Sequence, residues 1–224
     1  MKKRNAIGMA LITMLVLTLQ LPAQQNTQTI QIAPQVAAAM DAGLPLKQGR
    51  GDIPMTYLKT LYLPAQQNQV YPVFLFQLKN GDLGFAAAAD NPALLKSDHL
   101  VFTRVYRLTE GAAPQVVRER NIRMALEEAQ PTFQAEALNY YSIAGDIFPA
   151  GNYLLALALS TPDYAKIAVA YVEFALPDLS QLQGQLATTP IFSVTSLQML
   201  PAAETKLAVH KNSFVYNTLL LAPS

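Results

Sequence analysis

Few residues in this 224-residue chain combine the types and the spacing that metal binding needs. The chain has two histidines, His99 and His210, and no cysteine. A zinc site in a protein uses three or four clustered nitrogen, sulfur or oxygen ligands, and no such cluster surrounds either histidine in the sequence. Asp98 and His99 are neighbours, which points their side chains to opposite faces of a strand. We therefore predict no metal site and no cofactor.

Patterns that would indicate a catalytic nucleophile or acid are equally sparse. No serine has the Gly-x-Ser-x-Gly setting of a nucleophile elbow. Glu127-Glu128 lacks an evident carboxylate partner for glycoside hydrolysis. Asp82, Asp90 and Asp98 are expected in loops, where their spacing does not match a calcium-binding loop. The sequence therefore favours a protein that is not an enzyme.

Two patterns suggest contact with another molecule. Arg50-Gly51-Asp52 is an integrin-type tripeptide in an expected loop, and its plainer interpretation is a flexible glycine linker between two solvated charges. Tyr140 and Tyr141 are a candidate contact surface, as are Tyr57 and Tyr62. Tyrosines of this kind also fill the core of a β-sandwich with the hydroxyl group at its rim, so both interpretations stay open.

The first 23 residues have the layout of a secretory signal peptide. Lys2, Lys3 and Arg4 form the basic start, an apolar run extends from Ile7 to Leu21, and Ala23 is the small residue at the expected cleavage site. The apolar run is shorter than the ~20 residues needed to cross a bilayer, although an uncleaved anchor is the alternative. We expect an exported protein, periplasmic or extracellular, whose mature chain starts near Gln24.

Composition limits the classes of partner. The full chain has 16 basic and 15 acidic residues. Without the signal peptide, 13 basic and 15 acidic residues remain, a net charge of −2. Because nucleic-acid affinity depends on clustered lysine and arginine, we expect no nucleic-acid partner. No later apolar run is long enough to span a membrane, and the absence of cysteine means that the core alone must stabilise an exported domain.

Residues 24–51 have the composition of a polar linker that contains proline and glycine. Val36–Met40 is expected to form a short helix that ends at Gly43, a residue that suits the position after a helix. From residue 52 to residue 224 the pattern is that of β-strands. A boundary within this region is conceivable near residues 91–98 or 128–134.

Alternating or continuous apolar runs between turn signals predict the strands. Asn80-Gly81 is a strong turn signal, and Tyr153–Leu159 and Ile167–Leu176 are expected to form a hairpin. Asn121–Gln130 is rich in helix formers but also alternates, and we favour a strand that continues from Val116. The strands are expected at Met55–Leu63, Val70–Leu78, Leu83–Ala89 paired back across the turn, Leu100–Leu108, Val116–Gln130, Tyr153–Leu159, Ile167–Leu176, Ile191–Met199, Lys206–Val209 and Phe214–Leu221.

Short strands separated by turns, with little helix, predict an all-β fold. We expect an antiparallel β-sandwich, either one large sandwich or two small immunoglobulin-like sandwiches in tandem. Alanines dominate one side of each hairpin strand: Ala156 and Ala158 on the first, Ala168 and Ala170 on the second. Because alanine offers little apolar area, these positions predict a backbone or a covering segment that packs closely against them.

The segment Pro149-Ala150-Gly151-Asn152-Tyr153 resembles the Pro-x-Gly-x-Tyr start of a strand in many exported bacterial sandwich domains. Together with the order of the other pieces, it resembles the β-sandwich region that accompanies von Willebrand factor A-related and GWxTD-type exported bacterial proteins. The chain has neither the Asp-x-Ser-x-Ser metal motif nor a Gly-Trp-x-Thr-Asp motif, so the resemblance implies fold and export alone. It spans Ile53 to Leu221, and its other pieces are Asn80–Phe85, Val101–Arg107, Phe174–Leu179 and Phe192–Leu200.

The expected function is that of an exported, non-enzymatic β-sandwich. It would act as a structural or protein-interaction module of the cell envelope, with an envelope or extracellular protein as its partner. The alternative is a periplasmic carrier or sensor that binds an apolar ligand or a peptide between its sheets. A deep apolar pocket with convergent polar groups would favour this alternative.

Overall fold

The computed structural model describes residues 32–65, 69–179, 194–200 and 208–223. Within these ranges the chain is mostly antiparallel β-sheet, as expected, with a single α-helix. The elements are α1 (Pro34–Gly43), η1 (Leu44–Leu46), β1 (Thr56–Pro64), β2 (Val70–Lys79), η2 (Asn80–Leu83), β3 (Ala86–Ala87), β4 (Leu94–Leu108), β5 (Gln115–Ala129), η3 (Gln130–Thr132), β6 (Leu138–Ala144), β7 (Gly151–Ser160), β8 (Ile167–Leu176), β9 (Val194–Met199), β10 (Val209–Lys211), β11 (Phe214–Tyr216) and β12 (Leu219–Pro223).

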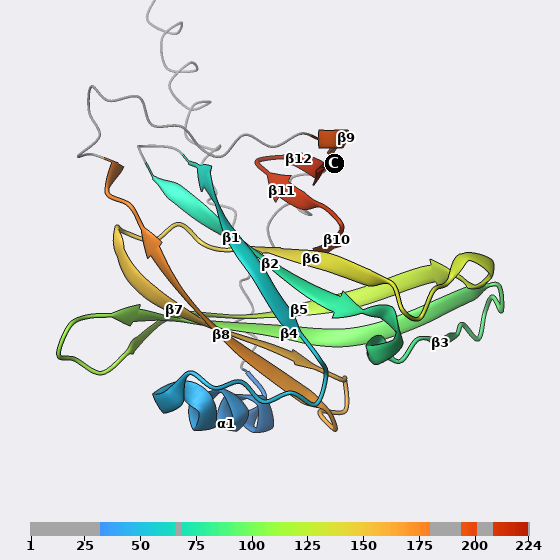
Figure 1. The fold of residues 1–224 in the computed structure, drawn as a ribbon, viewed down its shortest axis with the longest axis horizontal. Coiled ribbons are helices and arrows are strands. Elements are labelled where there is room, and N and C mark those ends of the chain that lie inside the picture. The colour runs from blue at the N-terminus through green and yellow to red at the C-terminus, as the bar shows by residue number, and fades with distance from the viewer. Residues whose placement is uncertain (1–31, 66–68, 180–193, 201–207, 224) are drawn as a thin grey trace, which may run out of the picture.

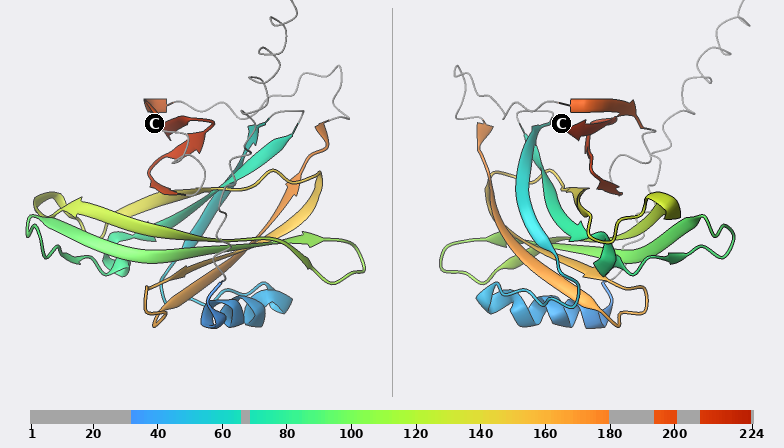
Figure 2. Two further views of the ribbon diagram at one scale, coloured as in Figure 1. Left: turned by 180° about the vertical axis from the view of Figure 1, so that it is seen from behind. Right: turned by 45° about the vertical axis from the view of Figure 1, so that its right-hand side comes forward.

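The strands form three sheets that, with the helix, make four layers (Figure 1). Sheet A contains β5, β4, β7 and β8 in that order, with β3 beside the start of β4. Sheet B has the order β1-β2-β6-β10, and sheet C has the order β11-β12-β9. Helix α1 lies on the outer face of sheet A, and sheet C lies on the far side of sheet B. Figure 2 shows the same stacking from two other directions.

The main core lies between sheets A and B. Aromatic rings fill its centre: Phe76 stacks on Tyr141 with ring centroids 5.8 Å apart, and Phe174 contacts both Phe74 and Tyr153, at 5.1 and 5.4 Å. Buried residues from position 53 to position 176 contribute to this one core, so neither conceivable boundary, near 91–98 or 128–134, separates two cores within the described residues. This core is one of three apolar clusters, and the other two lie under α1 and under sheet C.

Helix α1 forms where the sequence predicted a short helix. Pro34 occupies its first turn, where a missing N–H costs nothing. Val36 and Met40, one helical turn apart, are both 0% exposed against sheet A. The segment 32–51, whose composition is that of a linker, therefore contributes a buried layer. None of the described helices has the length and apolar character needed to cross a bilayer.

The alanines of the first hairpin strand lie under this helix. Ala156 and Ala158 are fully buried in the same cluster as Val36 and Met40. The short side chains let the helix approach β7 closely, which is the covering segment that the sequence predicted. Ala168 pairs with Leu159 and therefore faces the opposite side, toward the core between sheets A and B.

Polar contacts hold the helix in place. The Arg104 guanidinium on β4 donates from Nη1 to the Asp41 carboxylate on α1 at 2.6 Å and from Nε to Glu119 on β5 at 2.5 Å. The Tyr171 hydroxyl donates to the Met40 carbonyl oxygen near the helix end. One arginine thus joins the helix to two strands of sheet A.

Several expected strands are confirmed, above all the β7–β8 hairpin, which pairs from Gly151↔Leu176 to Ser160↔Ile167. Residues 121–129 are strand, as favoured, because they pair with β4 along its full length. The return of Leu83–Ala89 onto β2 was wrong: η2 follows β2, and β3 pairs with β4 instead. The expected strand Phe214–Leu221 is two strands, β11 and β12, joined at Asn217.

Strand β6 was missed, and it is the central partner of both β2 and β10. Other predictions fall outside the described residues. They are the signal peptide 1–23 with its cleavage at Ala23, the first part of the linker up to residue 31, and the beginnings of the strands expected at Ile191 and Lys206.

Candidate functional site

Sheet C carries the candidate binding surface. An apolar cluster holds this sheet on sheet B. Phe214 of β11 and Leu221 of β12 are buried against Leu63, Val73 and Leu75 of sheet B. Both faces of β2 are therefore covered, one by sheet A and the other by sheet C. This explains why β2 is apolar on both sides.

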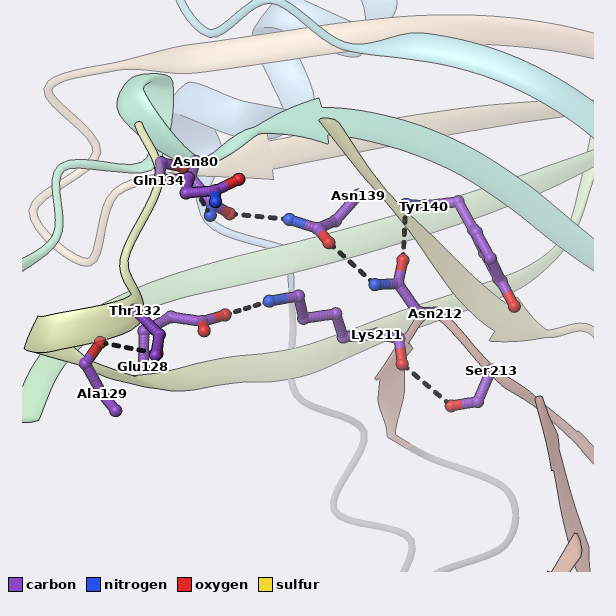
Figure 3. Close-up of polar contacts among 10 residues, drawn as sticks. All are labelled: Asn80, Glu128, Ala129, Thr132, Gln134, Asn139, Tyr140, Lys211, Asn212 and Ser213. Carbon is purple, nitrogen blue, oxygen red and sulfur yellow. Dashed lines mark hydrogen bonds and ion pairs between the residues drawn. The ribbon is translucent and has the colours of Figure 1, made fainter. Parts of the chain in front are cut away.

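A chain of side-chain amides fixes the connection that leads into sheet C (Figure 3). Asn80 Nδ2 donates to the Gln134 carbonyl at 3.0 Å, and Asn139 Nδ2 donates to Asn80 Oδ1 at 2.9 Å. Asn212 Nδ2 then donates to Asn139 Oδ1 at 2.7 Å, while Tyr140 N–H donates to Asn212 Oδ1 at 3.1 Å. Because each buried amide has a partner, the network can hold the β10–β11 turn in one position.

The β10–β11 turn requires an unusual backbone conformation. Asn212 has φ of 49°, in the left-handed region that asparagine tolerates better than most residues. Its N–H donates to the Tyr140 carbonyl at 2.8 Å, and Ser213 Oγ donates to the Lys211 carbonyl at 3.0 Å. The sharp reversal directs β11 away from sheet B and into sheet C.

An ion pair joins β10 to sheet A beneath this turn. Lys211 Nζ contacts the Glu128 carboxylate on β5, with both side chains half-buried (Figure 3). Tyr141 is fully buried beside this pair, and its hydroxyl has no hydrogen-bond partner among the described residues. Burial, with a smaller contribution from the Glu128 charge, raises the pKa of Tyr141 well above the usual value of a tyrosine.

Strand β9 forms the outer edge of sheet C. It pairs with β12 on one side, and no described strand pairs with its other side. Val194, Leu197 and Met199 are 44%, 60% and 75% exposed. An irregularity at Thr195 places Val194 opposite Pro223, while Leu197 and Met199 lie opposite Leu221 and Leu219. All three apolar side chains therefore share one face of the strand.

The sequence of strand β9 lacks two features that commonly protect a sheet edge. Its sequence from Val194 to Met199 contains no charged residue and no proline. Natural edge strands are commonly blunted by lysine, proline or a covering segment, because free backbone N–H and C=O groups pair readily with another strand. We call Val194, Leu197 and Met199, together with the edge of β9 that no described strand pairs with, the β9 surface.

The candidate contact tyrosines lie beneath sheet C and within the main core. Tyr141 is 0% exposed and stacks on Phe76, so its side chain offers no surface to a partner. Tyr140 packs at the margin of the cluster under sheet C, where burial raises the pKa of its hydroxyl to about 12. Tyr57 and Tyr62 pack against the main core from β1. Tyr141 thus fits the core interpretation, whereas Tyr57, Tyr62 and Tyr140 are only partly buried.

The Arg50-Gly51-Asp52 tripeptide is tied to the edge of β8. Arg50 Nη2 contacts Asp52 Oδ2 at 2.7 Å, and Asp52 accepts a hydrogen bond from the Ile167 N–H at 3.1 Å. This backbone hydrogen bond, followed by the Arg50 contact, lowers the pKa of Asp52. Gly49 must be glycine here, because a Cβ would lie 2.0 Å from the Val169 carbonyl oxygen. The tripeptide therefore extends the sheet and is not a flexible loop.

The two histidines are in different layers. His99 is buried between sheets A and B, where its Nε2 hydrogen-bonds the Leu83 carbonyl at 3.0 Å. His210, on β10, is partly exposed, and burial lowers its pKa. Among the described residues, no group of three or more histidine, aspartate or glutamate side chains could hold a metal ion.

Asp90, Asp98, Glu127 and Glu128 form ion pairs with basic residues. Asp90 contacts Lys96 at 3.1 Å, and Asp98 contacts Arg123 at 2.5 Å. Asp98 lies within β4, so its assignment to a loop was wrong. Glu127 and Glu128 pair with Lys96 and Lys211, respectively. The Asp98–Arg123 and Glu127–Lys96 pairs join the neighbouring strands β4 and β5, where such pairs stabilise a sheet and do not by themselves form a site.

One cleft of about 370 Å³ opens near His99, between η2, the start of β4 and the β7–β8 turn. Ser97 Oγ donates to the Leu83 carbonyl at 2.6 Å, the same oxygen that His99 contacts. Because both side chains share that acceptor and His99 Nδ1 is buried, neither is directed at the other as a nucleophile and base would be. The lining is charged, with Asp82, Lys96 and Lys166 at its rim.

The candidate site thus has two parts: an anchored base, formed by the amide chain and the cluster under sheet C, and the β9 surface. Sequence reasoning placed a strand over Ile191–Met199 but had no signal for its edge position. Comparison with models of known protein families gave no match, and no curated protein matched the sequence. The likeness to the sandwich region of von Willebrand factor A-related and GWxTD-type proteins therefore stays a prediction.

Proposed function

We propose that this protein is an exported, non-enzymatic β-sandwich that serves as a protein-interaction module of the cell envelope. The observation that carries the proposal is the β9 surface. It combines a strand edge that no described strand pairs with and three exposed apolar side chains, Val194, Leu197 and Met199, on a layer that is firmly anchored to the sandwich. The signal-peptide layout of residues 1–23 supports the location.

A strand edge of this kind binds an extended segment by β-augmentation. Main-chain hydrogen bonds to the free edge supply affinity, and pockets for alternate side chains supply specificity. In β9 the three apolar side chains share one face, and the polar residues Thr195, Ser196 and Gln198 are exposed as well. The complementary segment would therefore present apolar residues on the face that carries Val194, Leu197 and Met199. The amide chain through Asn139 and Asn212 supports the proposal, because it anchors the turn that leads into sheet C, and a preorganised sheet loses less entropy on binding.

The alternative, a carrier for an apolar ligand between the sheets, has less support. The space between sheets A and B is occupied by ring contacts such as Phe76–Tyr141 and Phe74–Phe174. A ligand there would have to displace well-packed aromatic side chains, whose truncation costs about 3–5 kcal/mol each.

Photocrosslinking in the native envelope tests the proposal. A photoreactive amino acid in place of Leu197 should give specific protein adducts. The same amino acid in place of Leu46, which is also strongly exposed but lies in η1 beside α1, should not. Equal labelling at both positions, or none at Leu197, would contradict an interaction through β9. Turnover of generic ester, peptide or glycoside substrates by the purified protein would contradict the non-enzymatic part.

A further inference from the structure

We infer that the partner at the β9 surface is a second copy of this chain, paired β9 to β9 in antiparallel orientation about a two-fold axis. The inference rests on the proposed function, because it names the occupant of the same surface. In such a dimer the two three-stranded sheets join into one six-stranded sheet, and each copy contributes the same residues to the contact.

The first argument is charge. In a contact about a two-fold axis, each residue near the axis lies beside its own copy, so any charged residue there would meet a like charge. Strand β9 contains no charged residue, and neither does its neighbour β12 from Leu219 to Pro223. Elsewhere the chain places charges along its strands, as in the Arg104–Glu119 and Lys96–Glu127 pairs of β4 and β5. Sheet C is thus suited to meet itself, whereas an acidic or basic partner would gain nothing from it.

The second argument is the position of the apolar side chains. Leu197 lies in the middle of the regular part of β9, between Ser196 and Met199. Antiparallel pairing with Leu197 opposite its own copy would place the two exposed apolar strips side by side on one face of the joined sheet. Cross-strand contacts between the two strips then reduce the exposure of Leu197 and Met199 to water.

The third argument is access. Sheet C is the outermost layer, at the end of the stack opposite α1 (Figure 1). A second molecule can therefore approach β9 without meeting sheet A or the helix. A contact built on one pair of six-residue strands lies at the small end of protein interfaces, so we expect a reversible dimer with a dissociation constant of roughly micromolar order.

Sedimentation of the mature chain measures the monomer–dimer equilibrium. Protein concentrations from about 1 to about 200 µM bracket a dissociation constant of micromolar order. The unmodified chain should pass from monomer to dimer. Leu197→Lys, which places two ammonium groups beside the axis, should weaken dimerisation at least tenfold. Leu46→Lys, a change of the same type at a comparably exposed residue far from β9, should leave it unchanged.

Cysteine crosslinking gives a second measurement that does not depend on a destabilising variant. The chain has no cysteine, so Leu197→Cys introduces a single thiol. Directly opposed Cβ atoms in an antiparallel pair are about 4.5–5.5 Å apart, close enough for mild oxidation to yield a disulfide-linked dimer. Leu46→Cys should stay monomeric under the same conditions.

The outcomes separate the inference from the proposed function. A protein that stays monomeric at the highest concentration overturns the inference, and so does a dimer that persists in Leu197→Lys while the Leu197→Cys variant forms no crosslink. If photocrosslinking at Leu197 then captures a different protein, the interaction function stands with another partner. If position 197 captures neither a second copy nor another protein, both proposals fall.

Discussion

Replacing Ala158 with leucine tests how tightly helix α1 packs on sheet A. Ala158 is fully buried beneath the helix, in a cluster with Val36 and Met40. Leucine adds three carbon atoms at this position, and in a core packed to crystal-like density there is no void to receive them. Overpacking of this kind costs about 1–3 kcal/mol in the free energy of unfolding.

The helix could escape the strain only by leaving the sheet. Detachment would expose Val36 and Met40, both completely buried, and each is worth about 1.5–3 kcal/mol when buried. It would also break the contacts of Asp41 with Arg104 and of the Met40 carbonyl with Tyr171. Because losing the two side chains alone costs about 3–6 kcal/mol, more than the overpacking, the helix should stay docked and global stability should fall.

Urea denaturation gives the change in the free energy of unfolding, and hydrogen exchange reports on residues 34–43. The matched control is Ala38→Leu, because Ala38 lies on the exposed side of the same helix. That variant should change stability by no more than about 0.5 kcal/mol. Unchanged stability in Ala158→Leu would mean that the helix is loosely placed. Rapid exchange confined to α1 would mean that it detaches, and either result would refute the packing argument.

Three further predictions follow from the core, from His210 and from the N-terminus. Leu157→Ala removes a buried leucine from the inner face of β7 and should cost about 2–5 kcal/mol in urea denaturation, whereas a loss below about 0.5 kcal/mol would place the residue at the surface. Burial lowers the folded-state pKa of His210 below its ordinary value of 6.5. Its contribution to stability is therefore complete above pH 6.5 and is lost as pH falls through the lower folded-state pKa. His210→Gln should flatten the stability–pH profile in that acid range, and an unchanged profile would show that His210 is not desolvated. N-terminal sequencing of protein from the native host should find Gln24 as the first residue, and an intact Met1 in a membrane fraction would contradict cleavage after Ala23.

The parts of the fold that follow from local pattern could be predicted, and those that depend on layering could not. Strands β7 and β8 alternate in opposite senses: Ala156 and Ala158 of β7 face α1, whereas Ala168 of β8 faces sheet B. The hairpin and the close neighbour of Ala158 were therefore accessible from the sequence, but the layer that each row of alanines faces was not. Strand β6 was missed because Tyr140 and Tyr141 face different apolar layers. With both faces covered, the polar and apolar alternation that marks a strand is weak.

The Asn80-Gly81 turn shows how tertiary contacts override a local signal. As a hairpin turn it would return the chain onto β2. Asn80 is instead buried, with its amide bonded to Gln134 and Asn139, so the chain leaves through η2 toward β4. The exposure of Leu197 could not be predicted from the sequence either, because the position of a strand at a sheet edge depends on the order of strands in the sheet.

The double cover of β2 has a consequence for how the chain folds during its synthesis. Synthesis from the N-terminus delivers β2 early, while the residues that cover its outer face arrive near the end. The Tyr71 hydroxyl, for example, donates to the Val215 carbonyl across a separation of 144 residues. Until then, a strand of high β-propensity has one apolar face in water, which is the condition that favours aggregation. Pro72, inside β2, has no backbone N–H to donate to an unwanted neighbouring strand, which limits such pairing during that interval.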